Sequence, residues 1–300
     1  MKPSQRPIAL IASLLAASVA TNASAASTVV LPTSMCPHSD PIFASGFETR
    51  PALPAQPSLG SGGAYPGNVT RSVVVGSLGA RNYYLHVPAG YTPTKAWPLL
   101  LVLRGSTQAG ASAQDAAAQQ VRNDWAGVSD SAGVIVVSVV GTSTQGGWGA
   151  ANDGMEISLD LDDAVAHYNV EQSRIDLWGF SAGAHFGHAL ALNNPDYFAA
   201  YGVSAGSLEQ YACTDSGIYP PTCAALLGAA QPKIPVDIHL GNTDPLYLQY
   251  GAGGDAARFA SNGWTPNRNL YYTLFAGGHS YSVAQLGEIW NHLCPFALGP

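Results

Sequence analysis

The chain has 300 residues, charged residues make up 10% of it, and its formal net charge is -7 at pH 7. An acidic chain is poorly suited to bind nucleic acid or anionic lipid, because their phosphates attract clustered Lys and Arg. Charged residues are ~25% of a typical soluble domain, so this surface must rely on uncharged polar residues and glycine. The composition therefore favours neutral or polymeric partners over nucleic acid and membranes.

The first 25 residues have the pattern of an export signal. Lys2 and Arg6 precede an apolar stretch at 8–20, and the small residues that follow predict cleavage near Ala25. Cleavage there removes two basic residues and no acid, so the net charge becomes -9 (ten basic residues against nineteen acidic). The apolar stretch is short for a membrane span, and no later segment has the ~18 uninterrupted apolar residues that a span needs. We predict a secreted protein, extracellular or periplasmic, with residues 1–25 as its signal peptide.

Residues 26–69 are rich in Pro, Gly, Ser and Ala and show little periodicity, which is typical of a tail or linker. Residues 70–300 are enough for one large catalytic domain with a full hydrophobic core. No internal repeat is visible in the chain.

Strand-like and helix-like segments alternate along residues 70–300. The predicted strands are 72–75, 82–87, 99–103, 134–140, 174–178, 200–203, 236–240 and 270–274, and the predicted helices are 113–128, 156–168, 182–192, 254–262 and 281–293. Several strands are continuous Val, Leu and Ile runs, as in strands buried on both faces of a parallel sheet. No helix separates the first two strands, so they predict an antiparallel hairpin. The fold class is α/β, with a mostly parallel central sheet flanked by helices and ligands bound at the carboxyl ends of the strands.

Ser181 lies in Gly-Phe-Ser-Ala-Gly at 179–183, between a predicted strand and a predicted helix. The pentapeptide alone is a weak signal, but a tight strand-to-helix turn needs small residues around a serine held in a strained conformation. Such a turn exposes the serine hydroxyl above the sheet edge, where the following helix presents backbone N–H groups to an oxyanion. The alternative is a serine N-cap in a glycine-rich loop. In this setting Ser181 is a candidate nucleophile.

A serine nucleophile needs a base, and the base needs an orienting carboxylate, which in this type of fold follow in the order Ser, acid, His. His279 lies in a glycine-rich loop directly after the last predicted strand, where a base is expected. His292 falls within a predicted helix and is interpreted as a structural or surface residue. Asp244 is the favoured acid because it lies in a turn beyond a strand end, and Asp237, within that strand, is its chief rival.

An oxyanion hole requires two backbone donors near the nucleophile. The residue after the nucleophile, Ala182, is expected to supply the first, and the loop 104–108 after a predicted strand is placed to supply the second. Gly105 permits a close backbone approach, and the Ser106 N–H is the preferred donor.

Two groups of polar residues suggest metal binding or acid/base catalysis but have simpler interpretations. His185 and His188 lie one helical turn apart, yet no third ligand follows at a suitable spacing. They are interpreted as polar residues packed on the helix behind Ser181. The three acids Asp160, Asp162 and Asp163 are interpreted as a solvated helix face with one structural salt bridge. No metal and no cofactor is predicted.

Four cysteines in an exported chain favour disulfides over metal or redox chemistry. Cys213 and Cys223 flank a short segment and predict a local bridge, which leaves Cys36 to pair with Cys294. The alternative is that the thiols are free and buried.

Five segments carry a family resemblance. In chain order they are Arg-Gly-Ser-Thr-Gln at 104–108, the Asp162-Asp163 pair ahead of Val-Glu-Gln-Ser-Arg-Ile at 170–175, the pentapeptide at 179–183, Asn-Pro-Asp-Tyr-Phe-Ala-Ala at 194–200 and Gly-Gly-His-Ser at 277–280. Together they resemble the polyhydroxybutyrate depolymerase and feruloyl esterase group of α/β-hydrolases, over roughly residues 81–292. The resemblance implies Ser181 as nucleophile, Asp244 as orienting acid and His279 as base. It also implies a secreted enzyme that cleaves carboxylic esters in polymers or plant cell-wall material without a cofactor.

Two loops depart from the pattern of that group. The group usually has His-Gly-Cys-Thr-Gln at the oxyanion loop, where this chain has Arg104 and Ser106 in place of His and Cys. In place of an aromatic-rich loop, residues 146–152 read Gly-Gly-Trp-Gly-Ala-Ala-Asn. Trp148 could stack on an acyl or aromatic group at the mouth of the site, or could anchor its loop on the core. Arg104 and Trp148 are the candidate substrate-binding residues.

The resemblance thus implies a secreted serine esterase that hydrolyses short-chain, polyester-derived or plant cell-wall esters through an acyl-enzyme. The alternatives are a polyhydroxybutyrate depolymerase proper, a serine peptidase or amidase, and an inactive binding protein on the same scaffold. No segment suggests the propeller or lid domain with which peptidases of this fold often select peptides. No polymer-binding domain is evident beyond residues 26–69, which favours soluble esters or accessible polymer chains. The sequence does not determine an oligomeric state.

Overall fold

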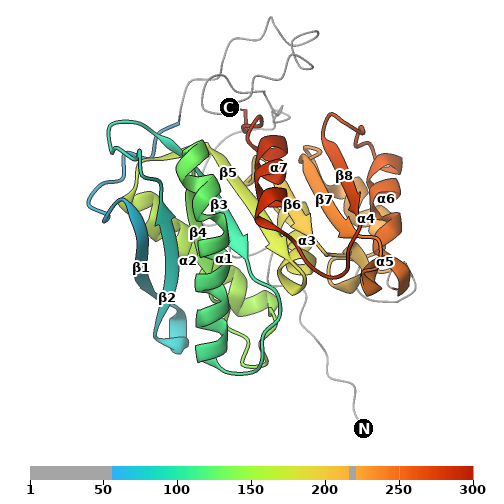
Figure 1. The fold of residues 1–300 in the computed structure, drawn as a ribbon, viewed down its shortest axis with the longest axis horizontal. Coiled ribbons are helices and arrows are strands. Elements are labelled where there is room, and N and C mark those ends of the chain that lie inside the picture. The colour runs from blue at the N-terminus through green and yellow to red at the C-terminus, as the bar shows by residue number, and fades with distance from the viewer. Residues whose placement is uncertain (1–55, 216–220, 250, 300) are drawn as a thin grey trace, which may run out of the picture.

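A computed structural model describes residues 56–215, 221–249 and 251–299, and strands and helices alternate along them (Figure 1). The strands are β1 (Gly67–Val74), β2 (Ala80–Val87), β3 (Trp97–Leu103), β4 (Ile135–Val139), β5 (Val170–Phe180), β6 (Tyr201–Ser204), β7 (Val236–Gly241) and β8 (Leu270–Phe275). The α-helices are α1 (Ala111–Ala132), α2 (Ala150–His167), α3 (Ala182–Asn193), α4 (Cys223–Ala229), α5 (Pro245–Gln249), α6 (Asp255–Ser261) and α7 (Val283–Leu293). Short 3-10 helices are η3 (Gly76–Leu78), η4 (Leu208–Gln210) and η5 (Ala252–Gly254).

The strands form one eight-stranded sheet in the order β1-β2-β4-β3-β5-β6-β7-β8. β1 pairs with β2, and β2 with β4, in antiparallel register, while every pair from β4 to β8 is parallel. The predicted α/β class and the initial hairpin are therefore confirmed. All eight predicted strands are present. β3, β4, β6 and β7 are buried throughout, and their apolar runs are a local signal, while β1 alternates between half-buried and exposed positions.

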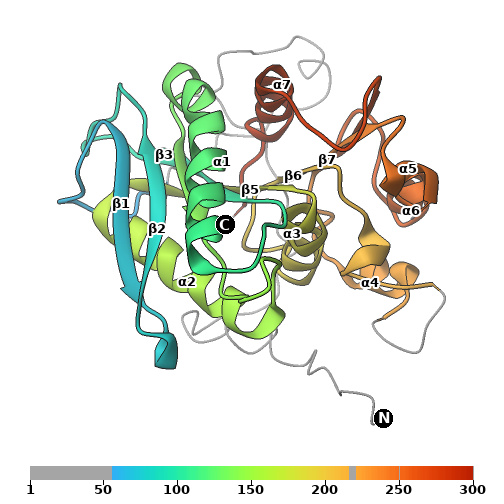
Figure 2. The same cartoon turned by 60° about the horizontal axis from the view of Figure 1, so that its bottom comes forward.

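Helices cover both faces of the sheet, with α1 and α7 on one face and α2 and α3 on the other (Figure 2). β3 shows why two helical layers are needed. Leu99, Leu101 and Leu103 belong to the core under α2 and α3, while Leu100 and Val102 belong to the core under α1 and α7. Alternate side chains of a strand point to opposite faces, so a strand that is apolar throughout must be covered twice.

Three details differ from the sequence-based expectations. α2 begins at Ala150 instead of residue 156, because the Asp153 carboxylate accepts the backbone N–H groups of Gly149 and Thr142 and so satisfies polar groups around the first turn. The short helices α4 and α5 were not predicted. β1 begins at Gly67, and Ser58 N–H donates to Val170 O at 2.8 Å, so the described end of the 26–69 segment lies against the domain.

Cys213 and Cys223 form the predicted disulfide, with Cα atoms 4.9 Å apart. Cys36, the export signal and most of the 26–69 segment lie outside the described residues, so the Cys36–Cys294 pair and the domain boundaries stay predictions. Within the residues that the structure covers, no helix combines the length and apolar character needed to cross a bilayer.

Candidate active site

Ser181 occupies the sharp turn between β5 and α3. Its backbone has φ 53° and ψ -118°, a conformation that non-glycine residues seldom adopt and that stores strain at functional sites. The turn is tight enough that a Cβ on Gly179 would overlap the backbone of Gly183. The Ser181 N–H donates to Ser204 O on the neighbouring strand at 3.0 Å, which ties the turn to the sheet. The local sequence thus forms the expected strand-turn-helix elbow.

The elbow brings Ser181 to His279 and Asp244, although the three residues are far apart in the sequence. The Ser181 Oγ lies 2.7 Å from His279 Nε2, and His279 Nδ1 lies 2.9 Å from Asp244 Oδ2. Asp244 is fully buried, whereas the His279 side chain is 37% exposed. The hydroxyl, the imidazole and the carboxylate therefore form the hydrogen-bonded chain of a Ser-His-Asp triad, with its open end toward solvent.

Both carboxylate oxygens of Asp244 accept a hydrogen bond. Oδ2 accepts the bond from His279 Nδ1, and Oδ1 accepts the Leu246 N–H at 2.8 Å at the start of α5. Because a carboxylate accepts and does not donate, the facing Nδ1 must carry a proton. In the neutral ring, the His279 Nε2 lone pair then faces the Ser181 hydroxyl, which is the tautomer that a general base requires.

Backbone hydrogen bonds join the acid turn to the base loop. Asn242 N–H donates to Phe275 O and Thr243 N–H to Gly277 O, both at 2.9 Å, and the Thr243 hydroxyl donates to the same Gly277 oxygen at 2.8 Å. A Cβ on Gly241 would overlap the carbonyl groups of Gly277 and Gly278, so glycine is needed where the two segments meet. The relative position of Asp244 and His279 is therefore set by backbone contacts.

The loop after β3 lies directly against the elbow. A Cβ on Gly105 would lie 3.4 Å from Ser181 Cβ, and a Cβ on Gly183 would overlap the carbonyl of Leu103. Glycine at both positions lets the two backbones approach within contact distance. The sequence-based reason for expecting an oxyanion loop here, a close approach at Gly105, is thus visible in the structure.

The two predicted oxyanion donors flank the nucleophile. Ala182 is the first residue of α3, where backbone N–H groups have no partner within the helix. Ser106 is exposed and directly follows Gly105. Their role as donors to an oxyanion stays a prediction.

Arg104 lies beneath these loops and not in the site. Its side chain is buried, and Nε donates to Val140 O at 2.8 Å while Nη1 donates to Gly105 O and Gly146 O at 2.9 Å each. Burial lowers the pKa of the guanidinium to about 10. The predicted contact with substrate is therefore wrong, because the side chain turns inward and joins the backbone of its own loop to that of the loop between β4 and α2.

Trp148 anchors its loop, one of the two interpretations that the sequence left open. Its indole N–H donates to Arg104 O at 2.9 Å, and its ring stacks on Phe186 with centroids 5.6 Å apart. The Arg104 guanidinium carbon lies 4.9 Å from the centre of the same ring. The indole remains partly exposed, so contact with a substrate stays a prediction.

His185 and His188 have separate protein partners. Ser207 N–H donates to His185 Nδ1 at 2.9 Å, and His188 Nδ1 lies 3.1 Å from the Tyr201 hydroxyl. Burial lowers the pKa of both residues, that of His188 to about 3, so both imidazoles are neutral near neutral pH. They pack behind Ser181 as expected.

The acids of α2 differ from the expected solvated face. Asp163 forms the predicted salt bridge, with Arg71 Nε at 2.5 Å, and Asp162 is exposed. Asp160, however, is buried, and neither of its oxygens has a hydrogen-bond partner among the described residues. Burial, followed by the charges of Glu156 and Asp163, raises the pKa of Asp160 to about 9. The expectation for Asp160 was wrong because this position of α2 faces the sheet.

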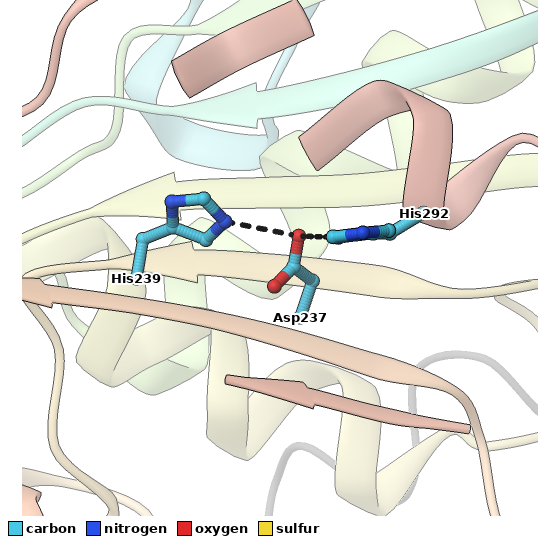
Figure 3. A group of neighbouring side chains, drawn as sticks. All are labelled: Asp237, His239 and His292. Carbon is cyan, nitrogen blue, oxygen red and sulfur yellow. Dashed lines mark hydrogen bonds and ion pairs between the residues drawn. The ribbon is translucent and has the colours of Figure 1, made fainter. Parts of the chain in front are cut away.

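Asp237, the rival acid, belongs to a different cluster. Its Oδ2 lies 3.2 Å from His239 Nε2 and 2.8 Å from His292 Nδ1, and both rings are directed at this carboxylate (Figure 3). Burial raises the pKa of Asp237, but the hydrogen bonds from both histidines outweigh burial and hold the pKa below its ordinary value. Sequence reasoning missed this cluster, although the i, i+2 spacing of Asp237 and His239 on a strand places them on one face.

Sequence comparison finds two curated relatives, while no known protein-family profile matches the chain. Over 253 residues the chain is 25% identical to the bifunctional acetylxylan esterase/xylanase XynS20E of Neocallimastix patriciarum, covering 73% of this chain and 34% of that protein. Over 167 residues it is 28% identical to Probable feruloyl esterase C of Aspergillus terreus, covering 54% of this chain and 59% of the relative. The chain thus matches about a third of the first relative and three fifths of the second.

Solved structures share the fold at low sequence identity. A ferulic acid esterase matches with TM-score 0.57 and 16% identity over 76% of this chain and 97% of its own. LpqC, the poly(3-hydroxybutyrate) depolymerase of Bordetella parapertussis, matches with TM-score 0.52 and 17% identity over 76% of this chain and 88% of its own. A Bacteroides ovatus structure that carries the name dipeptidyl aminopeptidase IV matches with TM-score 0.58 and 17% identity, over 76% of this chain and 35% of its own.

These comparisons establish two points. The chain has the α/β-hydrolase fold. Its relatives and structural neighbours include feruloyl and acetylxylan esterases and a polyhydroxybutyrate depolymerase, so the family resemblance that the five sequence segments carry is confirmed.

Proposed function

We propose that the chain is a secreted serine esterase that hydrolyses carboxylic esters through an acyl-enzyme on Ser181. The observation that carries the proposal is the continuous chain of contacts from Ser181 Oγ through His279 to Asp244, at 2.7 and 2.9 Å. The strained elbow supports it, because a serine that merely capped a helix would not need φ 53°. The esterase names of both curated relatives support an ester substrate.

The first half of the reaction forms the acyl-enzyme. The Ser181 oxygen attacks the ester carbonyl carbon while His279 Nε2 takes the hydroxyl proton, and Asp244 stabilises the resulting imidazolium. The carbonyl oxygen becomes an oxyanion, which the Ala182 and Ser106 N–H groups are placed to receive. The bond to the alcohol then breaks, and His279 returns the proton to the departing oxygen.

The second half repeats the sequence with water. His279 removes a proton from a water molecule, the hydroxide attacks the acyl carbon, and the proton passes to Ser181 Oγ as the acid leaves. The partly exposed His279 ring gives water a route to the base. The proposed reaction uses no cofactor, since each proton is given and taken by the same imidazole.

The substrate class is inferred from the curated relatives and from the resemblance that the five sequence segments carry. We favour short acyl esters and esters of plant cell-wall material, with polyhydroxybutyrate or its fragments as the second candidate, motivated by that resemblance. Because the chain matches only part of each curated relative, the activity of those whole proteins is not transferred. A peptide substrate has less support, since the likeness to the peptidase structure extends to the fold alone.

Labelling with a fluorophosphonate probe tests the proposed nucleophile. We expect one adduct on Ser181 in the wild-type protein, none in Ser181→Ala, and full labelling in the exposed control Ser72→Ala. Absence of labelling in folded wild-type protein contradicts the esterase proposal and favours a binding protein on the same scaffold.

A substrate panel tests the proposed class. The panel consists of 4-nitrophenyl esters of increasing acyl length, methyl ferulate, acetylated xylan, polyhydroxybutyrate film and a matching series of 4-nitroanilides. We expect the highest kcat/KM on short acyl esters. Higher kcat/KM on the anilides than on the matching esters contradicts the ester assignment and supports an amidase.

A further inference from the structure

The Asp237, His239 and His292 cluster is separate from the triad in its contacts. Asp237 and His239 come from β7, and His292 comes from α7, which packs on the same face of the sheet (Figures 1 and 3). Asp237 and His239 are buried, while the His292 side chain is 33% exposed. Each residue offers one nitrogen or oxygen atom, and these atoms lie within 4.8 Å of one another.

Hydrogen bonds alone leave this cluster incompletely satisfied. Both imidazoles approach the same carboxylate oxygen, Oδ2, while Asp237 Oδ1 is buried without a hydrogen-bond partner in the described part of the chain. Buried carboxylate oxygens without a partner are rare in proteins, and an ion bound by both oxygens of the carboxylate would satisfy Oδ1 as well as Oδ2. The ligand atoms of the three residues also lie close enough together for one small cation to contact all of them.

We propose that Asp237, His239 and His292 bind a divalent transition-metal ion, with Zn²⁺ the favoured ion. Zn²⁺ bonds of ~2.0–2.1 Å in a tetrahedron separate neighbouring ligand atoms by ~3.3 Å. The two nitrogens lie 3.2 and 2.8 Å from Asp237 Oδ2, so two of the three ligand pairs already have nearly that spacing, and all three atoms lie within 4.8 Å of one another. The His292 side chain is 33% exposed, which gives the ion a route from solvent.

The chemistry of the donors selects the type of ion. Imidazole nitrogen suits zinc and its neighbours, whereas Ca²⁺ and Mg²⁺ prefer oxygen ligands. The His292 ring stacks on Tyr271 with centroids 4.2 Å apart and planes 8° apart, which fixes its orientation. His239 Nδ1 has no hydrogen-bond partner among the described residues. A metal-bound imidazole usually donates its other N–H to a protein group, and loss of this outer hydrogen bond weakens metal binding ~10–100-fold. We therefore expect a moderate affinity for the ion.

The position of the site suggests a structural role. β7 leads directly into the turn that carries Asp244, and α7 begins four residues after His279. An ion held between β7 and α7 would fasten these two elements to each other. Each imidazole must present a lone pair to the ion, so binding moves the proton away from His239 Nε2 and His292 Nδ1. No step of the proposed ester hydrolysis passes through the ion.

Calorimetric titration of chelator-treated full-length protein with Zn²⁺ tests the site. We expect the wild type to bind one ion per chain. His292→Gln removes a direct ligand, so Zn²⁺ binding should weaken by at least ~100-fold, the upper end of the loss caused by removing only an outer hydrogen bond. The matched control is His167→Gln, since His167 also lies near a helix end, is also paired with an aspartate and has the same 33% side-chain exposure. His167→Gln should bind as the wild type does.

Two further readouts keep the test decisive. Co²⁺ in place of Zn²⁺ should give the visible absorption bands of a tetrahedral site in the wild type and in His167→Gln but not in His292→Gln. Zn²⁺ should raise the Tm of the wild type and not that of His292→Gln, because an ion that binds only the folded state stabilises it. Wild-type protein that binds no Zn²⁺, or equal binding in wild type and His292→Gln, overturns the proposal.

Discussion

The strand β7 and the turn that follows it supply the carboxylates of two clusters. Each cluster contains a hydrogen-bonded Asp–His pair, and the two clusters differ in their third residue. Asp244 accepts from His279 Nδ1 at 2.9 Å, and Asp237 accepts from His292 Nδ1 at 2.8 Å. Both aspartates are fully buried and both histidines are partly exposed. In the first cluster the third group is the Ser181 hydroxyl, and in the second it is the His239 imidazole. An Asp–His pair is therefore not by itself a sign of catalysis.

The difference between the clusters follows from their positions along the strand. Asp244 lies three residues beyond the end of β7, where loops leave the sheet and the Ser181 elbow can meet His279. Asp237 lies within β7 and under α7, where neighbouring positions are filled by packed side chains. Beyond the strand end the His279 side chain is 37% exposed, while within the strand Asp237 and His239 are buried.

Removal of a triad group should have the largest effect. Ser181→Ala and His279→Ala are each expected to lower kcat by ~10⁶, because nucleophile and base act as a unit. Hydrolysis of 4-nitrophenyl acetate measures the loss, and His167→Ala is expected to keep the wild-type kcat. Zn²⁺ binding should persist in Ser181→Ala, and its loss there would show that the two clusters are not independent.

Substitution of the two aspartates compares the clusters directly. Asp244→Asn should lower kcat by ~10⁴, because the amide favours the wrong tautomer of His279. Asp237→Asn should weaken Zn²⁺ binding and lower kcat far less than Asp244→Asn does. Steady-state kinetics and Zn²⁺ titration of both variants provide the test, and equal losses of kcat would contradict the assignment of Asp244 as the orienting acid.

Substitution of Arg104 tests how far the activity of the triad depends on the loops that support it. Arg104→Met removes the side-chain donor from three backbone carbonyl groups. Gly146 O keeps the Thr107 N–H at 2.9 Å, while loss of the donor to Val140 O and Gly105 O costs ~1–3 kcal/mol for each buried group left unsatisfied. Displacement of the oxyanion loop should also lower kcat by up to ~10²-fold. Urea unfolding and hydrolysis kinetics measure the two effects. If the substitution instead raises KM for large esters and leaves stability unchanged, Arg104 contacts substrate after all.

The smallest effect on kcat is expected at Asp160, a buried carboxyl group whose oxygens have no hydrogen-bond partner among the described residues and whose substitution changes stability. Its pKa is raised to about 9 from an ordinary value of 3.8, so the folded state holds a proton that the unfolded state releases. Its contribution to stability is full below pH 3.8 and is lost as pH rises toward 9, with a slope of ~1.4 kcal/mol per pH unit. Asp160→Asn should remove this slope. Parallel stability curves for wild type and variant, from urea unfolding between about pH 5 and 9, would contradict the assignment.

Much of the fold and the triad could be predicted from the sequence by itself. The inner strands are marked by apolar runs, the edge strand β1 by alternation, and Ser181 by the small residues that its turn requires. His279 and Asp244 could be placed because each follows a strand end, and the carboxyl ends of parallel strands share one edge of the sheet. These are signals that a short stretch of chain carries, so no knowledge of distant neighbours was needed.

The remaining features were decided by the tertiary structure. Arg104 turns inward because the loop between β4 and α2 offers it two carbonyl groups, and Asp160 is buried because its side of α2 faces the sheet. His292 meets Asp237 only because α7 packs on β7. The direction of a side chain and the partner that it meets depend on which elements come together, and a local pattern of residues does not contain that information.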